Sequence, residues 1–190
     1  QGQWSAMGST ANLAARAMAK SLNGAGDGYH GCLGTGVVRL LPTLNGGRTG
    51  LTEAQAAAAG YDATSVVCVL DDKAHYYPGA SSFVIKLTAE TATGKLLGLQ
   101  VFGAGTVDKM TYIAVVGISQ NMKLSGFDTL DFAYAPPFST AIHPFVTACY
   151  VLENKIDGIF ESVSPAEYAS GKAKGYTVLD VQPAPSVPNA

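Results

Sequence analysis

Three short runs in the middle of this chain are dominated by apolar and β-branched residues and predict β-strands. They span residues 65–70, 83–90 and 95–102. The last two are separated by Thr91-Ala-Thr-Gly94, a hairpin-length turn that contains glycine. Short strands joined by a tight turn predict an antiparallel sheet, because parallel neighbours need a long crossover connection.

Four other segments have the composition or spacing of helices. The first is rich in alanine and begins at Ser9 or Thr10, which are both good N-cap residues. Thr52 is a cap for the second, and Pro144 is admissible near the first turn of the last. The predicted helices cover residues 9–22, 52–59, 107–121 and 138–155.

A further strand is predicted over residues 34–41, ended by Pro42 and a turn at Asn45-Gly46-Gly47. Helices and strands therefore do not alternate regularly along the chain, as they would in a parallel βαβ protein. The order predicts an α+β fold, with an antiparallel sheet flanked by helices.

The last thirty residues follow a different pattern. Ser164-Pro-Ala-Glu-Tyr168 is typical of a capped helix start, and residues 176–181 predict one strand. Three prolines follow within residues 182–190. A lone strand without neighbours cannot form a core, so this segment is either a tail or the start of a further domain.

The composition of the chain reduces the number of functions that fit it. The chain has 190 residues, 47% of them hydrophobic, and a net charge of −2, so we expect neither a nucleic-acid nor a membrane partner. The cysteines at positions 32, 68 and 149 form no CxxC pair, which indicates neither a redox dithiol nor a metal site. Scattered free cysteines and the absence of a leader pattern favour a cytoplasmic protein. Gln1 is not a natural first residue, so we expect a piece of a longer chain.

The most distinctive candidate chemistry lies in Asp131-Phe-Ala-Tyr-Ala-Pro-Pro-Phe-Ser139. Each proline fixes its own φ and biases the preceding residue toward an extended conformation, so the loop holds Tyr134 in one place. A second tyrosine pair, Tyr76 and Tyr77, also precedes a proline. A phenol can donate a hydrogen bond to a thiolate, but tyrosines are also common packing residues at protein interfaces. Both interpretations stay open from the residues alone.

An ordered series of motifs resembles the flavin-dependent pyridine nucleotide-disulfide oxidoreductases, closest to the coenzyme A-disulfide reductases. Each motif is short, but together they cover residues 5–158. The motifs are Gly8-Ser-Thr-Ala-Asn12 with Arg16, Gly31-Cys-Leu-Gly-Thr35, Arg48-Thr-Gly-Leu-Thr-Glu53, His75-Tyr-Tyr-Pro-Gly79, Leu97-Gly-Leu-Gln-Val-Phe-Gly103, Val107-Asp-Lys109 and the Tyr134 loop. Two positions depart from the family pattern, which are Ala15 and Met110.

The resemblance implies three parts: residues 1–27 as the end of an FAD-binding domain, 28–158 as the interface or dimerisation domain, and 159–190 as a linker. Val178-Leu-Asp-Val-Gln182 in the last part resembles the start of a rhodanese-like domain, although the usual arginine is Gln182 here. The glycine-rich loops that bind FAD and NAD(P)H in the family, and its redox cysteine, are absent from this sequence.

The resemblance also implies roles for single residues. Tyr134 and Tyr76 are expected to reach the redox cysteine of a partner subunit in a homodimer that reduces coenzyme A disulfide or a related small disulfide. Tyr77 is a secondary candidate, because the two adjacent tyrosines face opposite sides of an extended backbone. Ala11, Asn12 and Arg16 are the candidates for contact with FAD.

His143-Pro144 resembles the catalytic histidine motif of dihydrolipoamide dehydrogenase and glutathione reductase. Those enzymes follow it with a threonine and then a glutamate that orients the ring, whereas Phe145 and Ala148 stand here. His143 is therefore interpreted as a helix-start residue and kept as a secondary catalytic candidate. Two other hypotheses are a non-catalytic dimerisation module and a relative of the NADH oxidases and peroxidases.

Overall fold

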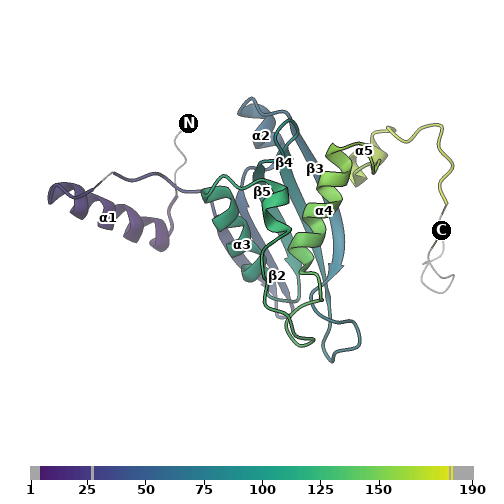
Figure 1. Ribbon diagram of the computed structural model, residues 1–190, viewed down its shortest axis with the longest axis horizontal. Coiled ribbons are helices and arrows are strands. Elements are labelled where there is room, and N and C mark those ends of the chain that lie inside the picture. The colour runs from purple at the N-terminus through teal and green to yellow at the C-terminus, as the bar shows by residue number, and fades with distance from the viewer. Residues whose placement is uncertain (1–4, 27, 180, 182–190) are drawn as a thin grey trace. The chain divides into compact units, whose positions relative to one another are not determined.

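The computed structural model describes residues 5–26, 28–179 and 181, and its internal contacts divide the chain into two units, residues 1–160 and 161–190. A five-stranded antiparallel sheet forms the centre of the first unit (Figure 1). Its spatial order is β1-β2-β5-β4-β3, which confirms the predicted antiparallel α+β fold. The strands are β1 (Gly36–Leu41), β2 (Leu44–Gly50), β3 (Ala63–Asp71), β4 (Ser82–Glu90) and β5 (Leu96–Gly103).

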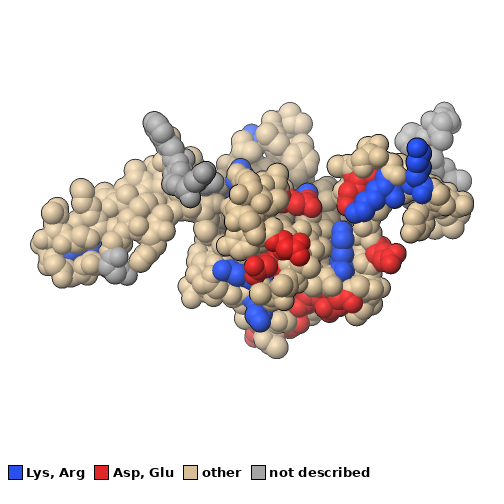
Figure 2. Space-filling model, turned by 90° about the horizontal axis from the view of Figure 1, so that it is seen from above, with Lys and Arg blue, Asp and Glu red and all other residues tan. Residues whose placement is uncertain are grey.

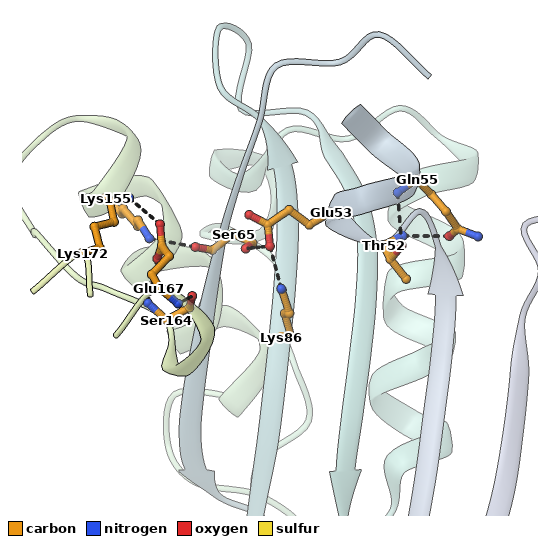
Figure 3. A network of polar contacts seen from close by, with 9 residues as sticks. All are labelled: Thr52, Glu53, Gln55, Ser65, Lys86, Lys155, Ser164, Glu167 and Lys172. Carbon is orange, nitrogen blue, oxygen red and sulfur yellow. Dashed lines mark hydrogen bonds and ion pairs between the residues drawn. The ribbon is translucent and has the colours of Figure 1, made fainter. Parts of the chain in front are cut away.

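Two helices cover one face of this sheet, α3 (Val107–Ser119) and α4 (Pro144–Ile156) (Figure 1). A short 3₁₀ helix, η1 (Leu124–Phe127), lies between them in the chain. The helix α2 (Glu53–Ala58) follows β2 and begins with a reciprocal capping box, in which Thr52 and Gln55 each satisfy the other's backbone N–H (Figure 3). The helix α1 (Gly8–Leu22) has no buried residue among its members.

The hydrophobic core fills the space between the sheet and the two covering helices. Alternate residues of β4 point into it, as the period of a half-buried strand requires. The Phe127 and Phe145 rings meet at its centre, with centroids 5.0 Å apart. Fully buried members from the sheet, α3, η1 and α4 are Ile85, Leu87, Leu96, Leu99, Met110, Leu124, Phe127, Phe145, Cys149 and Leu152.

The turn predicted at Asn45-Gly46-Gly47 is wrong, because these residues belong to strand β2 and pair with β5. The chain instead reverses direction before these residues, between Leu41 at the end of β1 and Leu44 at the start of β2. Gly47 is needed for packing instead. A Cβ on Gly47 would collide with the Thr111 hydroxyl of α3 and lie 3.1 Å from Val101 Cγ1, so glycine lets α3 approach the sheet closely.

The last predicted helix also begins later than expected. Residues 138–143 are irregular, and α4 starts at Pro144 after the His143 N-cap. Proline suits the first helical position because its missing N–H has no partner there. The 3₁₀ turn at Leu124–Phe127 was not predicted, since four residues are too few to show a helical period.

The second unit contains one short helix, α5 (Pro165–Ala169), as the capping pattern predicts. Ser164 and Glu167 form its capping box, and Lys172 makes an ion pair with Glu167 (Figure 3). The strand predicted over residues 176–181 is wrong for the residues that the structure describes there, 176–179 and 181. The described part of the second unit contains no other strand with which they could pair. Asp180 and Gln182 lie outside the described residues.

Candidate functional site

The two tyrosine-bearing loops lie at the same end of the sheet (Figure 1). Residues 72–81 connect β3 to β4, and residues 128–143 connect η1 to α4. Lys155, near the end of α4, donates to the carbonyl of Ser65 at 3.1 Å, near the start of β3. The first turn of α4 is therefore directed toward the last residues of β3, where the 72–81 loop begins.

The buried carboxylate of Asp72 forms a hydrogen bond across the base of the 72–81 loop. Asp72 Oδ1 accepts a hydrogen bond of 2.8 Å from the backbone N–H of Ser81, and the Asp72 N–H donates to the Ser81 carbonyl at 2.8 Å. Within the loop, Tyr77 N–H donates to the Ala74 carbonyl, which makes a tight turn. The loop is thus fixed at its base while its tip projects from the domain.

The tyrosines at this tip differ in exposure. Tyr76 is 68% exposed and Tyr77 is 38% exposed. The ring of Tyr76 contacts the edge of His75, with centroids 5.5 Å apart. Neither hydroxyl group makes a hydrogen bond within the described part of the chain, so both are available to another molecule.

Tyr134 is 51% exposed and stands just before a turn that is bonded at several points. The N–H groups of Phe138 and Ser139 both donate to the Ala135 carbonyl, at 2.8 and 3.2 Å. Lys109 Nζ, in the first turn of α3, donates to the Phe138 carbonyl at 3.1 Å. The Ser139 hydroxyl is buried and has no hydrogen-bond partner among the described residues.

His143 ends this loop as the N-cap of α4, and it is only 6% exposed. Its Nδ1 accepts from the backbone N–H of Phe145 at 3.3 Å, so the neutral ring carries its proton on Nε2. The ring stacks on Phe132, with centroids 4.9 Å apart. Burial, and secondarily the charge of Lys109, lower the pKa of His143 to about 4. A base of that pKa accepts a proton from a thiol poorly, whereas a neutral cap suits this position.

The α1 candidates lie apart from the tyrosines. Ala11, Asn12 and Arg16 are exposed, and the Asn12 amide donates to the Gly8 carbonyl of its own helix at 2.8 Å. The connection from α1 joins the domain where Gly50 N–H donates to the Leu33 carbonyl, at the end of β2. That is the end of the sheet opposite to the tyrosine loops.

Two of the free cysteines are unsuited to redox chemistry. Cys68 and Cys149 are buried, and burial raises the pKa of both thiols. No cluster of three or more His, Cys, Asp or Glu side chains among the described residues could hold a metal ion. No helix in the described part of the chain is long and apolar enough to cross a bilayer.

The sheet face away from α3 and α4 carries an exposed apolar row. Cross-strand pairing places Val38 beside Gly46, then Phe102, Val84 and Val69, one from each strand. The four side chains of this row are all exposed. From above, Figure 2 shows acidic and basic side chains interspersed over another side of the molecule. An apolar row of this kind is typical of a surface that another protein part covers.

Residues 42–145 match the dimerisation domain of the pyridine nucleotide-disulphide oxidoreductases. The chain belongs to this family. The match includes strands β2 to β5, α3 and both tyrosine loops, and it confirms the resemblance found in the sequence motifs.

Similar curated proteins and solved structures agree with this assignment. An NAD(P)H sulfur oxidoreductase (CoA-dependent) of Pyrococcus furiosus is 34% identical over 130 residues, which are 66% of this chain and 28% of that protein. An NAD-dependent persulfide reductase from A. fulgidus has a TM-score of 0.80 at 31% identity, over 85% of this chain and 30% of its own. The Bacillus anthracis protein CoADR-RHD has a TM-score of 0.76 at 30% identity, over 83% and 28%. The chain therefore spans less than a third of these relatives.

Proposed function

We propose that this chain is the interface part of an FAD-dependent NAD(P)H disulfide reductase of the coenzyme A-disulfide or persulfide type. The observation that carries the proposal is the placement of Tyr134 and Tyr76 on two fixed loops at one end of the domain. The domain boundaries that accompany it are 1–27 for the end of the FAD domain, 28–158 for the interface domain and 159–190 for a linker or the start of a rhodanese-like domain.

The proposed role of the tyrosines is to donate hydrogen bonds to sulfur. A phenolic O–H that bonds to a thiolate, or to the sulfur that leaves when a disulfide is reduced, stabilises the negative charge on that atom. Both tyrosines are exposed while the backbone near them is hydrogen-bonded, so the chain that carries each phenol is held in place. His143 does not take the role of base, because its Nδ1 is occupied and its pKa is about 4.

The geometry supports a site shared between two subunits. The tyrosine loops and the attachment point of α1 lie at opposite ends of the sheet, so tyrosines and flavin-contact candidates of one chain belong to different regions. A homodimer resolves this separation, because the tyrosines of one subunit can serve the cysteine of the other. The exposed apolar row on the open sheet face is consistent with a domain that is covered in the full assembly.

FAD and NAD(P)H are the cofactors of the proposed parent enzyme. Ala11 and Asn12, in the first half of α1, present small exposed side chains, and Arg16 adds one exposed charge. These residues would contribute to FAD binding, with the rest of the binding site supplied by a longer chain. FAD, when bound, would supply the electron transfer from NAD(P)H. The three free cysteines are consistent with a cytoplasmic location.

The test is disulfide reduction by a full-length protein that carries this segment. We expect Tyr134→Phe to lower the NADH- or NADPH-dependent reduction of coenzyme A disulfide about 10²-fold or more, within the range for loss of a proton-donating group. The control is Tyr168→Phe in the second unit, where the tyrosine is similarly exposed at 53%. Full activity of Tyr134→Phe would refute the tyrosine assignment.

A non-catalytic dimerisation module is the second candidate, and the exposed apolar row favours it equally. The two functions differ in one respect. A module would associate with itself or a partner and would leave disulfide reduction unaffected by either tyrosine. An NADH oxidase or peroxidase would consume oxygen or peroxide instead of disulfide, which the same assay separates.

A further inference from the structure

One surface lysine is bonded to the loop that carries Tyr134. Lys109 Nζ donates to the Phe138 carbonyl at 3.1 Å, across 29 positions of sequence. The same turn is bonded internally from the Phe138 and Ser139 N–H groups to the Ala135 carbonyl. The lysine therefore connects α3, which is packed on the sheet, to the four residues that follow the tyrosine.

The position of this lysine does not benefit its own helix. Lys109 is the third residue of α3, and a positive charge in the first helical turn opposes the helix dipole. It makes no ion pair among the described residues. Among the described residues its side chain bonds to the tyrosine loop alone, so the contact that favours this placement is the one to Phe138.

We propose that Lys109 is a positioning residue for Tyr134, which it places by holding the Phe138 carbonyl and hence the Ala135–Ser139 turn against α3. The inference rests on the proposed function of Tyr134. It adds a residue that touches neither substrate nor cofactor and that acts through the loop alone.

The other side of the same loop is held by a different contact. Phe132 precedes Tyr134 by two residues and stacks on the His143 ring, which is fixed as the cap of α4. The tyrosine thus lies between two anchors, Phe132 on one side and Phe138 on the other. Removing the Lys109 bond frees the second anchor and leaves the first in place.

The first test measures loop order in this 190-residue chain, without any enzymatic readout. Amide hydrogen exchange is followed by NMR at Phe138 and Ser139 in Lys109→Met, Lys109→Arg and a control, Lys123→Met. Lys123 is exposed, and its side chain makes no hydrogen bond among the described residues. We expect exchange at the two amides to be about tenfold faster in Lys109→Met and near wild type in Lys109→Arg and the control, since a net hydrogen bond corresponds to roughly that factor. Unchanged exchange in Lys109→Met would overturn the proposal.

The second test is a double-mutant cycle in the full-length reductase. Lys109→Met should lower the rate of disulfide reduction several-fold, and adding it to Tyr134→Phe should cost nothing further, because the positioned phenol is already gone. Lys109→Arg should restore the rate. Effects that multiply would show that Lys109 acts independently of Tyr134 and would overturn the proposal.

The two tests separate failure of this inference from failure of the proposed function. If Tyr134→Phe is fully active, the tyrosine assignment is refuted, and the functional importance of positioning by Lys109 is refuted with it. The exchange measurement would then still establish whether Lys109 holds the loop. If Tyr134→Phe is impaired, but amide exchange is unchanged in Lys109→Met and the effects of the two substitutions on the rate multiply, only the Lys109 proposal is overturned.

Discussion

The substitution Gly117→Ala tests how closely α3 packs against the hydrophobic core. In an exposed helix interior this change stabilises by about 1 kcal/mol, because alanine has the higher helix propensity. At Gly117 the new Cβ would collide with Cζ of Phe127 and lie 3.2 Å from Leu96 Cδ2. The Phe127 side chain has little room to move away from the new Cβ, since it is buried and its ring packs against Phe145.

The two effects have opposite signs, and overpacking a filled core costs about 1–3 kcal/mol. With about 2 kcal/mol for the clash and about 1 kcal/mol for propensity, the net loss in the free energy of unfolding is about 1 kcal/mol. That corresponds to a fall in Tm of about 2–4 °C for a chain of this size.

Urea denaturation followed by far-UV circular dichroism measures the change. Phe127→Leu in the same background removes the colliding ring, so the double mutant should be less destabilised than the sum of the two single changes. The adjacent, exposed Val116→Ala serves as the control for helix propensity. A stabilised Gly117→Ala protein with no coupling to Phe127 would refute the close packing of α3.

Three further changes test the loops. Asp72→Ala leaves the partly buried Ser81 N–H without its charged acceptor and should cost about 1–3 kcal/mol in urea denaturation, whereas the exposed Asp71→Asn should cost under about 0.5 kcal/mol. Equal effects would contradict the role of Asp72 at the base of the loop. Ser139→Ala removes a buried hydroxyl that has no partner among the described residues and should leave stability unchanged or raise it by about 1 kcal/mol, so a clear loss would show an unrecognised bond. The pKa of His143 in the folded chain, about 4, lies below the ordinary 6.5, so the unfolded chain takes up the imidazole proton first and stability should fall as the pH drops from 6.5 toward 4. His143→Asn keeps a side-chain cap and should flatten the dependence of the urea midpoint on pH in that range. An unchanged slope would contradict the buried neutral ring.

Much of the fold follows from local patterns in the sequence. The strands 83–90 and 95–102 could be predicted because apolar runs of the right length flank a glycine turn, and β4 and β5 lie within one residue of those limits. Thr52 could be predicted as a cap because its hydroxyl and Gln55 have the spacing of a capping box. These features depend on neighbours in the chain.

The errors come from long-range packing. Gly46 and Gly47 have the composition of a turn, but both pair with β5 inside strand β2, and the approach of Thr111 from α3 leaves room only for glycine at position 47. The role of His143 depends on Phe132 and Lys109, which are brought to it by the fold. The Lys109 bond to Phe138 joins residues from different elements, so no sequence signal could have indicated it.

The candidate site was predicted as two separate motifs. The prolines after Tyr134 and Tyr77 indicated constrained loops, but their common location depends on the direction of α4 relative to β3. Sequence spacing contains no information about that direction. The catalytic roles of Tyr134 and Tyr76 stay predictions until activity is measured.

The central claim is that the tyrosines of one subunit serve the redox cysteine of the other, and subunit complementation tests it most directly. One full-length variant lacks the redox cysteine, and the other carries Tyr134→Phe with Tyr76→Phe, so each homodimer is impaired. Heterodimers formed by co-expression contain one site with an intact cysteine facing intact tyrosines, if the tyrosines act across the interface. Disulfide reduction restored toward half of the wild-type rate per heterodimer is the predicted result, and heterodimers as inactive as both parents would contradict the account.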